Sequence, residues 1–208
     1  MQSLLPAVAG SPVSTRIKAI LAGGLVLGLG AAMTLAAWTD QEFATGTFTA
    51  GHFNLVGSTD GTTFTEHATD DPGVPAALSF STGFDNLSKS STVAAAYVLH
   101  LDAATTVAGT GIVSAAAGSG AALTHLTYGV IQVAAVGDCT PGAAGTERVP
   151  SGTAFGSTTG ASSFALGAGD GTLPGTSVVL CIQVTSDSGL VQGTAATATW
   201  QFTATSNS

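Results

Sequence analysis

The stretch Ala196-Thr197-Ala198-Thr199-Trp200-Gln201-Phe202-Thr203-Ala204-Thr205 decides the fold class of this chain. Its apolar residues alternate strictly with threonine and glutamine. Because successive side chains of a β-strand point to opposite faces, this alternation produces one apolar face and one hydroxyl-rich face. The stretch therefore predicts a half-buried β-strand.

The same alternation recurs earlier in the chain. It predicts further strands at Val178–Val184, at Ala95–Leu101, from Leu126 to Val130 and at Leu78–Phe80. Within the first of these, Cys181 lies on the face opposite the apolar residues. His100 lies outside the apolar face of its strand, which predicts a position on the surface.

Turn signals separate the predicted strands. They are Asp60-Gly61, Asp71-Pro72-Gly73, Pro141-Gly142, Asp170-Gly171 and Pro174-Gly175. Many strands divided by such turns predict an all-β fold, a jelly-roll-like antiparallel β-sandwich. Thr105–Ala122 is compatible with a short helix or with a strand. Pro141–Gly171 is rich in Gly, Ser and Thr, and we expect a long mobile loop there.

An export signal is predicted before the strands. Arg16 and Lys18 precede the uncharged run Ala19–Ala37, whose small residues near its end suit a signal peptidase. We therefore expect a cleavable signal helix within residues 1–36, cut after Ala36 or Ala37. The alternative is a retained membrane anchor, because the run approaches the ~20 residues that span a bilayer. The glycines of the run favour cleavage.

The charge balance after the expected cut excludes some partners. All 12 acidic residues of the chain follow the cut, whereas only Lys89 and Arg148 are basic there, a net charge of −10. Nucleic acids and anionic lipids attract clustered Lys and Arg, so neither is an expected partner. We expect membrane contact only through the uncleaved signal. Charged residues make up 8 % of the chain against about 25 % in an ordinary domain.

The two cysteines both follow the signal. In an oxidising compartment the default for Cys139 and Cys181 is one disulfide. A redox or metal site would need more ligands nearby than the sequence shows. Given the export signal, the pair is therefore predicted to form a structural disulfide.

No residue pattern points clearly to catalysis. The four histidines, His52, His67, His100 and His125, form no His-Glu-x-x-His motif, and no Gly-x-Ser-x-Gly motif is present. The acidic residues Asp60, Glu66, Asp70 and Asp71 have oxygen ligands that suit Ca²⁺, although their spacing is not that of an EF-hand. We expect solvated turn carboxylates, no metal site, no catalytic residue and no cofactor.

The order of these features resembles the TasA/camelysin family of exported matrix proteins, which often carry a signal peptide of the SipW-dependent type. The matching residues are Lys18–Gly24, Thr34–Ala36, Trp38-Thr39-Asp40, Phe48–Gly51, Phe53–Leu55, Phe84–Leu87 and, near the end, Val179–Val184 and Trp200–Phe202. The Gly/Ser/Thr-rich loops and the disulfide depart from the best-known members of that family.

The resemblance implies a jelly-roll subunit of an extracellular fibre in a biofilm or surface matrix. Residues 37–55 would be an extended donor segment and residues 56–208 the β-sandwich domain. In that family the N-terminal segment of one subunit can add as a strand to its neighbour, which makes a head-to-tail homopolymer. The candidate anchors for this junction are Trp38, Phe43, Phe48 and Phe53. A dedicated signal peptidase is the other implied partner.

The sequence leaves alternatives open for the N-terminal segment and for the function. Residues 37–55 could instead fold back as the first strand of their own domain, since both arrangements use the same residues. The domain could also be a monomeric secreted binding module for a glycan or a cell-surface partner. A secreted metallopeptidase-like hydrolase is the least favoured alternative, because no zinc motif is present.

Overall fold

The computed structural model describes residues 13, 16–25, 41–47, 50–67 and 75–207. The chain divides into two units, residues 1–48 and residues 49–208. In the first unit, residues 16–25 form a helix and residues 41–47 belong to neither helix nor strand. Among the described residues, no helix is both long enough and apolar enough to cross a membrane.

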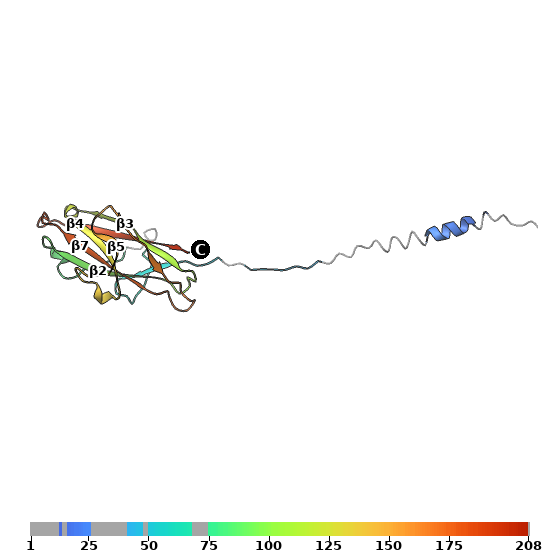
Figure 1. Ribbon diagram of the computed structural model, residues 1–208, viewed down its shortest axis with the longest axis horizontal. Coiled ribbons are helices and arrows are strands. Elements are labelled where there is room, and N and C mark those ends of the chain that lie inside the picture. The colour runs from blue at the N-terminus through green and yellow to red at the C-terminus, as the bar shows by residue number, and fades with distance from the viewer. Residues whose placement is uncertain (1–12, 14–15, 26–40, 48–49, 68–74, 208) are drawn as a thin grey trace, which may run out of the picture. The chain divides into compact units, whose positions relative to one another are not determined.

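The second unit is built from β-strands (Figure 1). They are β1 (Leu55–Ser58), β2 (Thr92–Leu101), β3 (Gly109–Ser119), β4 (Leu126–Val133), β5 (Thr146–Ala154), β6 (Phe164–Leu166), β7 (Val178–Ser186) and β8 (Thr197–Ser206). Three short 3-10 turns, Phe84–Asn86, Leu123–His125 and Val136–Asp138, lie between them. The all-β prediction is confirmed.

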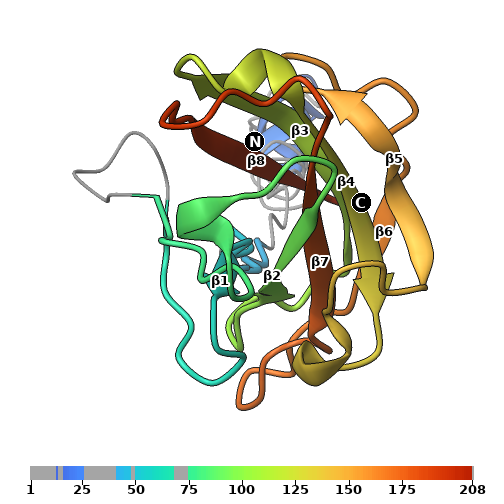
Figure 2. The ribbon, with the colours of Figure 1, turned by 90° about the vertical axis from the view of Figure 1, so that its left-hand side faces the viewer.

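The strands form two antiparallel sheets. The larger sheet has the order β1-β2-β7-β4-β5 and the smaller sheet has the order β6-β3-β8. Figure 2 shows β8 beside β3 in one sheet, with β7 and β2 in the other. The main core lies between the sheets, where Tyr97 of β2 packs against Phe202 of β8 with ring centroids 5.3 Å apart. This is a β-sandwich arrangement.

Strand β7 is the centre of the larger sheet and is buried on both faces. Leu180 and Ile182 point into the main core, and both are fully buried. Val179 and Cys181 point to the other face, where they join a second apolar cluster. Both faces are therefore covered, although the sequence of β7 alternates as a half-buried strand would.

The second cluster corrects the predicted position of His100. The side chain does point away from the main core, as the alternation indicated, but the residue is 7 % exposed. Phe64 stacks on its imidazole ring, with ring centroids 3.9 Å apart. A loop from before β2 therefore covers a face that the strand pattern alone assigned to solvent.

Two stretches outside the predicted strands contain strands in the structure. The long mobile loop predicted over Pro141–Gly171 is wrong, because β5 and β6 lie within it. Val149 is the only fully buried residue of β5. The sequence of β5 therefore shows little of the alternation of apolar residues that identifies a strand. The ambiguous stretch Thr105–Ala122 contains β3.

Leu78 and Phe80 do not lie in a strand, although both pack against the main core. Beside them the Ser81 amide donates to the Ala94 carbonyl over 2.8 Å. The segment is extended and buries alternate side chains, but it forms no ladder long enough to count as a strand.

Candidate functional site

The predicted junction residues fall in different parts of the chain. Trp38, Phe48 and the signal-cleavage residues Ala36 and Ala37 lie outside the described residues. Phe43 is described, and its side chain is 86 % exposed within a segment that has no regular structure. An exposed phenylalanine in an extended stretch is available to another surface.

Phe53 has a different environment from Phe43. It is half-buried and packs against the main core of the second unit. Its ring lies so close to Gly109 of β3 that a Cβ at position 109 would sit 2.9 Å from the ring. Phe53 is therefore an anchor within its own domain. Leu55 then begins β1 and pairs with Leu101 of β2.

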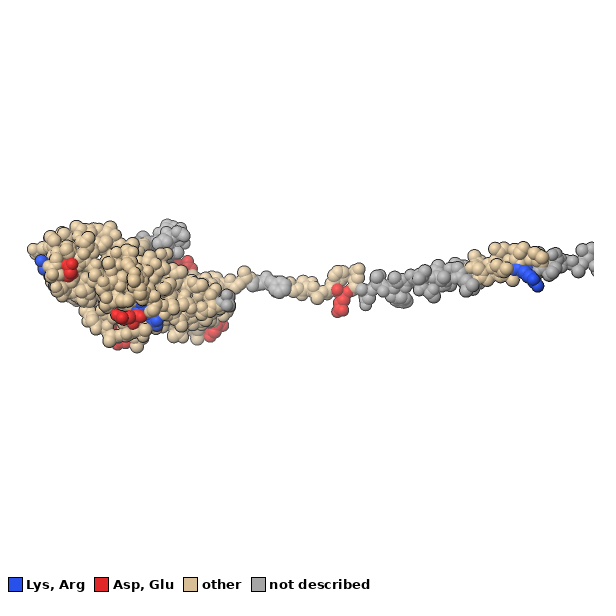
Figure 3. Space-filling model, turned by 45° about the horizontal axis from the view of Figure 1, so that its top comes forward, with Lys and Arg blue, Asp and Glu red and all other residues tan. Residues whose placement is uncertain are grey.

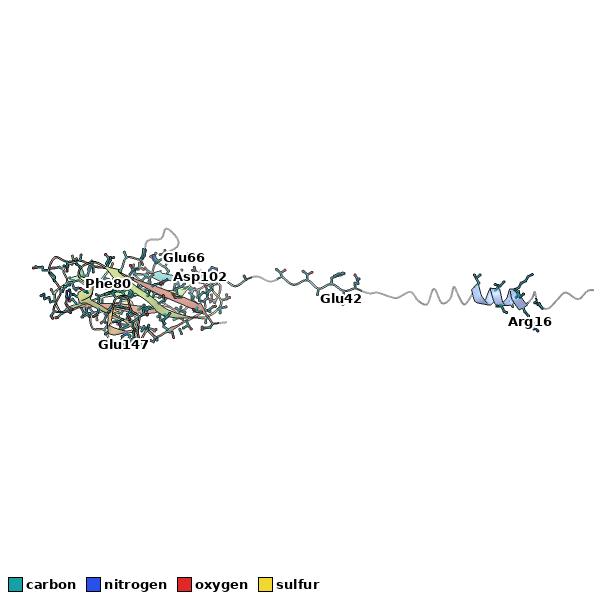
Figure 4. All side chains as sticks on the ribbon, turned by 90° about the horizontal axis from the view of Figure 1, so that it is seen from above. Arg16, Glu42, Glu66, Phe80, Asp102 and Glu147 are labelled. Carbon is teal, nitrogen blue, oxygen red and sulfur yellow. A yellow bond between two sulfur atoms is a disulfide. The ribbon has the colours of Figure 1, made fainter. Side chains whose placement is uncertain are left out.

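A polar network fixes the chain next to Phe53. The Asp102 carboxylate accepts a hydrogen bond from the Asn54 side chain over 3.1 Å, and its other oxygen accepts one from the Thr105 hydroxyl over 2.8 Å. His52 Nε2 lies 3.0 Å from the same carboxylate. The Asn54 amide donates to the Thr105 hydroxyl over 2.8 Å. The domain thus holds residues 52–54 against the turn after β2, near Asp102 in Figure 4.

These contacts determine the charge state of Asp102. Burial raises the pKa of this carboxyl, but the hydrogen bonds from Thr105, His52 and Asn54 outweigh burial and lower the pKa to about 2. The carboxylate therefore stays ionised, and remains an acceptor for the network, to a lower pH than an ordinary aspartate. Sequence reasoning missed this network, because residues so far apart along the chain give no local signal.

The edge strand β8 is the second feature of the candidate site. It pairs with β3 from Gly109↔Ser206 to Ser119↔Thr197 and forms the end of the smaller sheet. Its sequence has no charged residue, no proline and no glycine. The irregularity in this ladder is on β3, where Ser114 is the extra residue, so β8 itself is continuous. In the described parts of the chain, no backbone hydrogen bond joins β8 to a segment other than β3.

Two other edge strands, β5 and β1, carry features that discourage strand addition. Edge strand β5 contains Glu147, Arg148 and Pro150, and its pairing with β4 is interrupted by two register shifts. Edge strand β1 is only four residues long, and its Gly57 exchanges two 3.0 Å backbone hydrogen bonds with Thr65. Charge, proline, bulges and shortness are the usual protections of a sheet edge. Strand β8 is ten residues long and has none of them.

Few charges lie on the surface of the second unit. Most of the face visible in Figure 3 consists of uncharged residues, with isolated acidic and basic side chains. Thr197, Thr199, Gln201, Thr203 and Thr205 of β8 are exposed and add no charge. Electrostatic repulsion therefore does little to keep another strand away from this edge.

The predicted disulfide is present. Cys139 and Cys181 are bonded with a Cα–Cα distance of 5.1 Å, and Cys181 is fully buried in the second cluster. The bond ties the loop after β4 to the central strand β7. A buried structural disulfide indicates an oxidising environment.

The polar groups with catalytic potential have structural partners. His125 lies 3.0 Å from Asp187, whose carboxylate also accepts a hydrogen bond from the Gly189 amide. Asp60 accepts hydrogen bonds from the amides of Thr62 and Thr63, and these lower its pKa. The described residues contain no group of three His, Cys, Asp or Glu side chains placed to hold a metal. Asp70 and Asp71 of the possible Ca²⁺ set lie outside them.

Comparison with known protein families finds no family that matches this chain, and comparison with curated proteins finds no match.

Proposed function

We propose that this protein is a secreted structural subunit that polymerises into extracellular matrix or surface fibres. Each subunit donates its N-terminal segment as a strand to the sheet of the next subunit, as the resemblance to the TasA/camelysin family implies. The junction does not close into a ring, so it propagates as a filament. The proposal also takes the β-sandwich of residues 49–208 to be a jelly roll.

Strand order is the observation that carries the proposal. In an eight-stranded jelly roll numbered along the chain, one sheet has the order 2-7-4-5 and the other has the order 1-8-3-6. The structure has β2-β7-β4-β5 in one sheet and β6-β3-β8 in the other. Strand β1 lies next to β2 instead of β8. Within the described residues, the jelly-roll position beside β8 is therefore unfilled, and a donated strand would complete that order.

The N-terminal segment has the properties of a donated strand. Residues 41–47 have no regular structure and contain no proline, and Phe43 is exposed. Strand addition takes its affinity from main-chain hydrogen bonds and its register from side chains that fill pockets. Trp38, Phe43 and Phe48 are the donated anchors in this proposal. Phe53 stays with its own domain, because it packs against that domain's core.

Export supports the same function. Residues 16–25, which lie within the predicted signal of residues 1–36, are helical. In this proposal the signal is removed after Ala36 or Ala37 by a dedicated signal peptidase. The Cys139–Cys181 bond fits an oxidising, extracellular compartment. The polar network at residues 52–54 would hold the root of the donated segment while the residues before it leave the domain.

The test is negative-stain electron microscopy of residues 37–208 beside residues 49–208, at matched concentrations over time. We expect filaments from the longer protein only. In the longer protein, Phe43→Ser should reduce the filament yield severalfold, because it removes a donated anchor. Exposed Phe84→Ser serves as the matched control outside the segment. Filaments from residues 49–208 alone would refute strand donation.

A further inference from the structure

The sequence of β8 is nearly the same in both directions. From Thr197 to Thr205 it is Thr-Ala-Thr-Trp-Gln-Phe-Thr-Ala-Thr, and the reverse order differs only by exchanging Trp200 and Phe202. Gln201 is the centre of this symmetry. An edge strand with this symmetry can pair with a second copy of itself.

Two copies of a symmetric strand match each other when they pair antiparallel about their centre. With Gln201 facing Gln201 of a second copy, threonine faces threonine and alanine faces alanine along the strand. Trp200 then faces Phe202 of the other copy. Thr–Thr and aromatic–aromatic pairs are among the favourable cross-strand pairs, and no like charges meet. The same patch is used by both copies, as a two-fold interface requires.

In the structure, β8 is available for pairing with another strand. Strand β8 is the end strand of the smaller sheet and is continuous over ten residues. Gln201 and its threonine neighbours are exposed, whereas Trp200 and Phe202 are half-buried on the core side. Trp200 already contacts Phe80, with ring centroids 6.1 Å apart, so an added strand would meet an existing aromatic surface.

We propose that two copies of this protein associate through β8, which pairs antiparallel with β8 of the second copy about Gln201. The smaller sheets of the two copies then form one continuous sheet with β8 at its centre. This inference does not depend on the proposed function. The dimer uses the edge that a donated strand would use, so dimerisation and fibre growth compete for β8.

Residues 49–208 are suitable for testing the pairing without the N-terminal segment. They contain every strand and both apolar clusters found among the described residues, and they form a compact unit of their own. Sedimentation equilibrium over a range of concentrations should show a monomer–dimer equilibrium. A protein that remains monomeric at all concentrations would overturn the proposal.

Charge pairs at positions 199 and 203 test the register. In the proposed dimer, residue 199 faces residue 203 of the second copy. T199K/T203K places like charges opposite each other and should raise the dimer Kd by about tenfold or more. T199K/T203E places opposite charges together and should keep the Kd within about threefold of the original. Both variants lose the Thr203–Ser114 hydrogen bond equally, so their difference reports the pairing. Equal Kd values for the two variants would exclude this register.

Cysteine cross-linking tests the centre of symmetry. Gln201→Cys places two thiols opposite each other, so mild oxidation should give a covalent dimer. Thr199→Cys should give little, because the two thiols would be separated by four residues, about 13 Å along the strands. Equal cross-linking of both variants would overturn the proposed register.

These experiments distinguish a failure of the proposed β8 dimer from a failure of the proposed fibre. A register-specific dimer of residues 49–208, with no filaments from residues 37–208 even at concentrations below the dimer Kd, supports the dimer and rejects the fibre. If instead residues 49–208 stay monomeric and residues 37–208 form filaments that T199K/T203K abolishes, the edge accepts the N-terminal segment and not a second β8.

Discussion

Strands β7 and β8 have similar alternating sequences but opposite positions. Strand β7 lies at the centre of the larger sheet, and eight of its nine residues are buried. Strand β8 lies at the edge of the smaller sheet, and its residues alternate between exposed and half-buried along most of its length. The comparison shows that alternation identifies a strand without identifying its place in the sheet.

The difference between these strands arises from what covers their second faces. The loop after β4 lies over β7, held by the disulfide to Cys181 and by hydrogen bonds from Gln183 to the carbonyls of Thr140 and Ala143, each 3.3 Å long. The exposed face of β8 carries Thr and Gln side chains. Four sets of variants test this contrast between a covered and an open strand face.

Removing the disulfide should produce the largest loss of stability. Cys139 and Cys181 are 42 residues apart, and the double variant C139A/C181A should lower the free energy of unfolding by about 4 kcal/mol in the chain-entropy model. Urea denaturation of residues 49–208 measures this loss. A loss below about 1 kcal/mol would mean that the loop covers β7 without help from the bond.

Truncating a central core side chain should come next. Leu180→Ala removes a fully buried side chain of β7 and should cost about 3 kcal/mol, because it leaves a cavity between the sheets. Leu173→Ala is the matched control, since Leu173 is 63 % exposed, and it should change the stability by less than about 0.5 kcal/mol. Similar losses in the two variants would contradict the assignment of the core.

Acidification should destabilise the covered face that contains His100. Burial lowers the pKa of His100 below its usual 6.5, although the charge of Asp102 acts in the opposite direction. The neutral ring therefore favours folding above pH 6.5, and this stability is lost as the pH falls through the lowered pKa. His100→Leu should flatten this part of the pH–stability curve measured by urea denaturation. An unchanged curve would show that the pKa of His100 is the same in the folded and unfolded chain, which would contradict its burial.

Two glutamines provide the smallest and best matched comparison. Gln183 of β7 is 7 % exposed and makes two hydrogen bonds to the covering loop, so Gln183→Ala should cost about 1 kcal/mol. Gln201 of β8 is exposed, and Gln201→Ala should change the stability of the monomer by less than about 0.5 kcal/mol. Thermal unfolding at low protein concentration distinguishes the two. Equal losses of stability in the two variants would contradict the assignment of a covered face to β7 and an open face to β8.

Parts of the candidate site could be predicted from the sequence because their signals are local. Local sequence patterns alone indicated the β8 strand, the turn at Asp60-Gly61 and the Cys139–Cys181 pair. Gly61 does have the positive φ, 75°, that the turn requires. The network of Asn54, Asp102 and Thr105 was not predictable, because it joins segments about fifty residues apart.

The all-β fold class follows from the sequence, since period-two alternation, Gly/Pro turns and the cysteine pair are properties of neighbouring residues or of composition. The sequence did not determine which strand would be central and which would form an edge. The packing of the folded chain is what covers β7 on both faces and leaves β8 at the end of its sheet. Burial of the second face depends on contacts made by loops that are distant in the sequence, and these contacts do not change the alternating pattern of the strand that they cover.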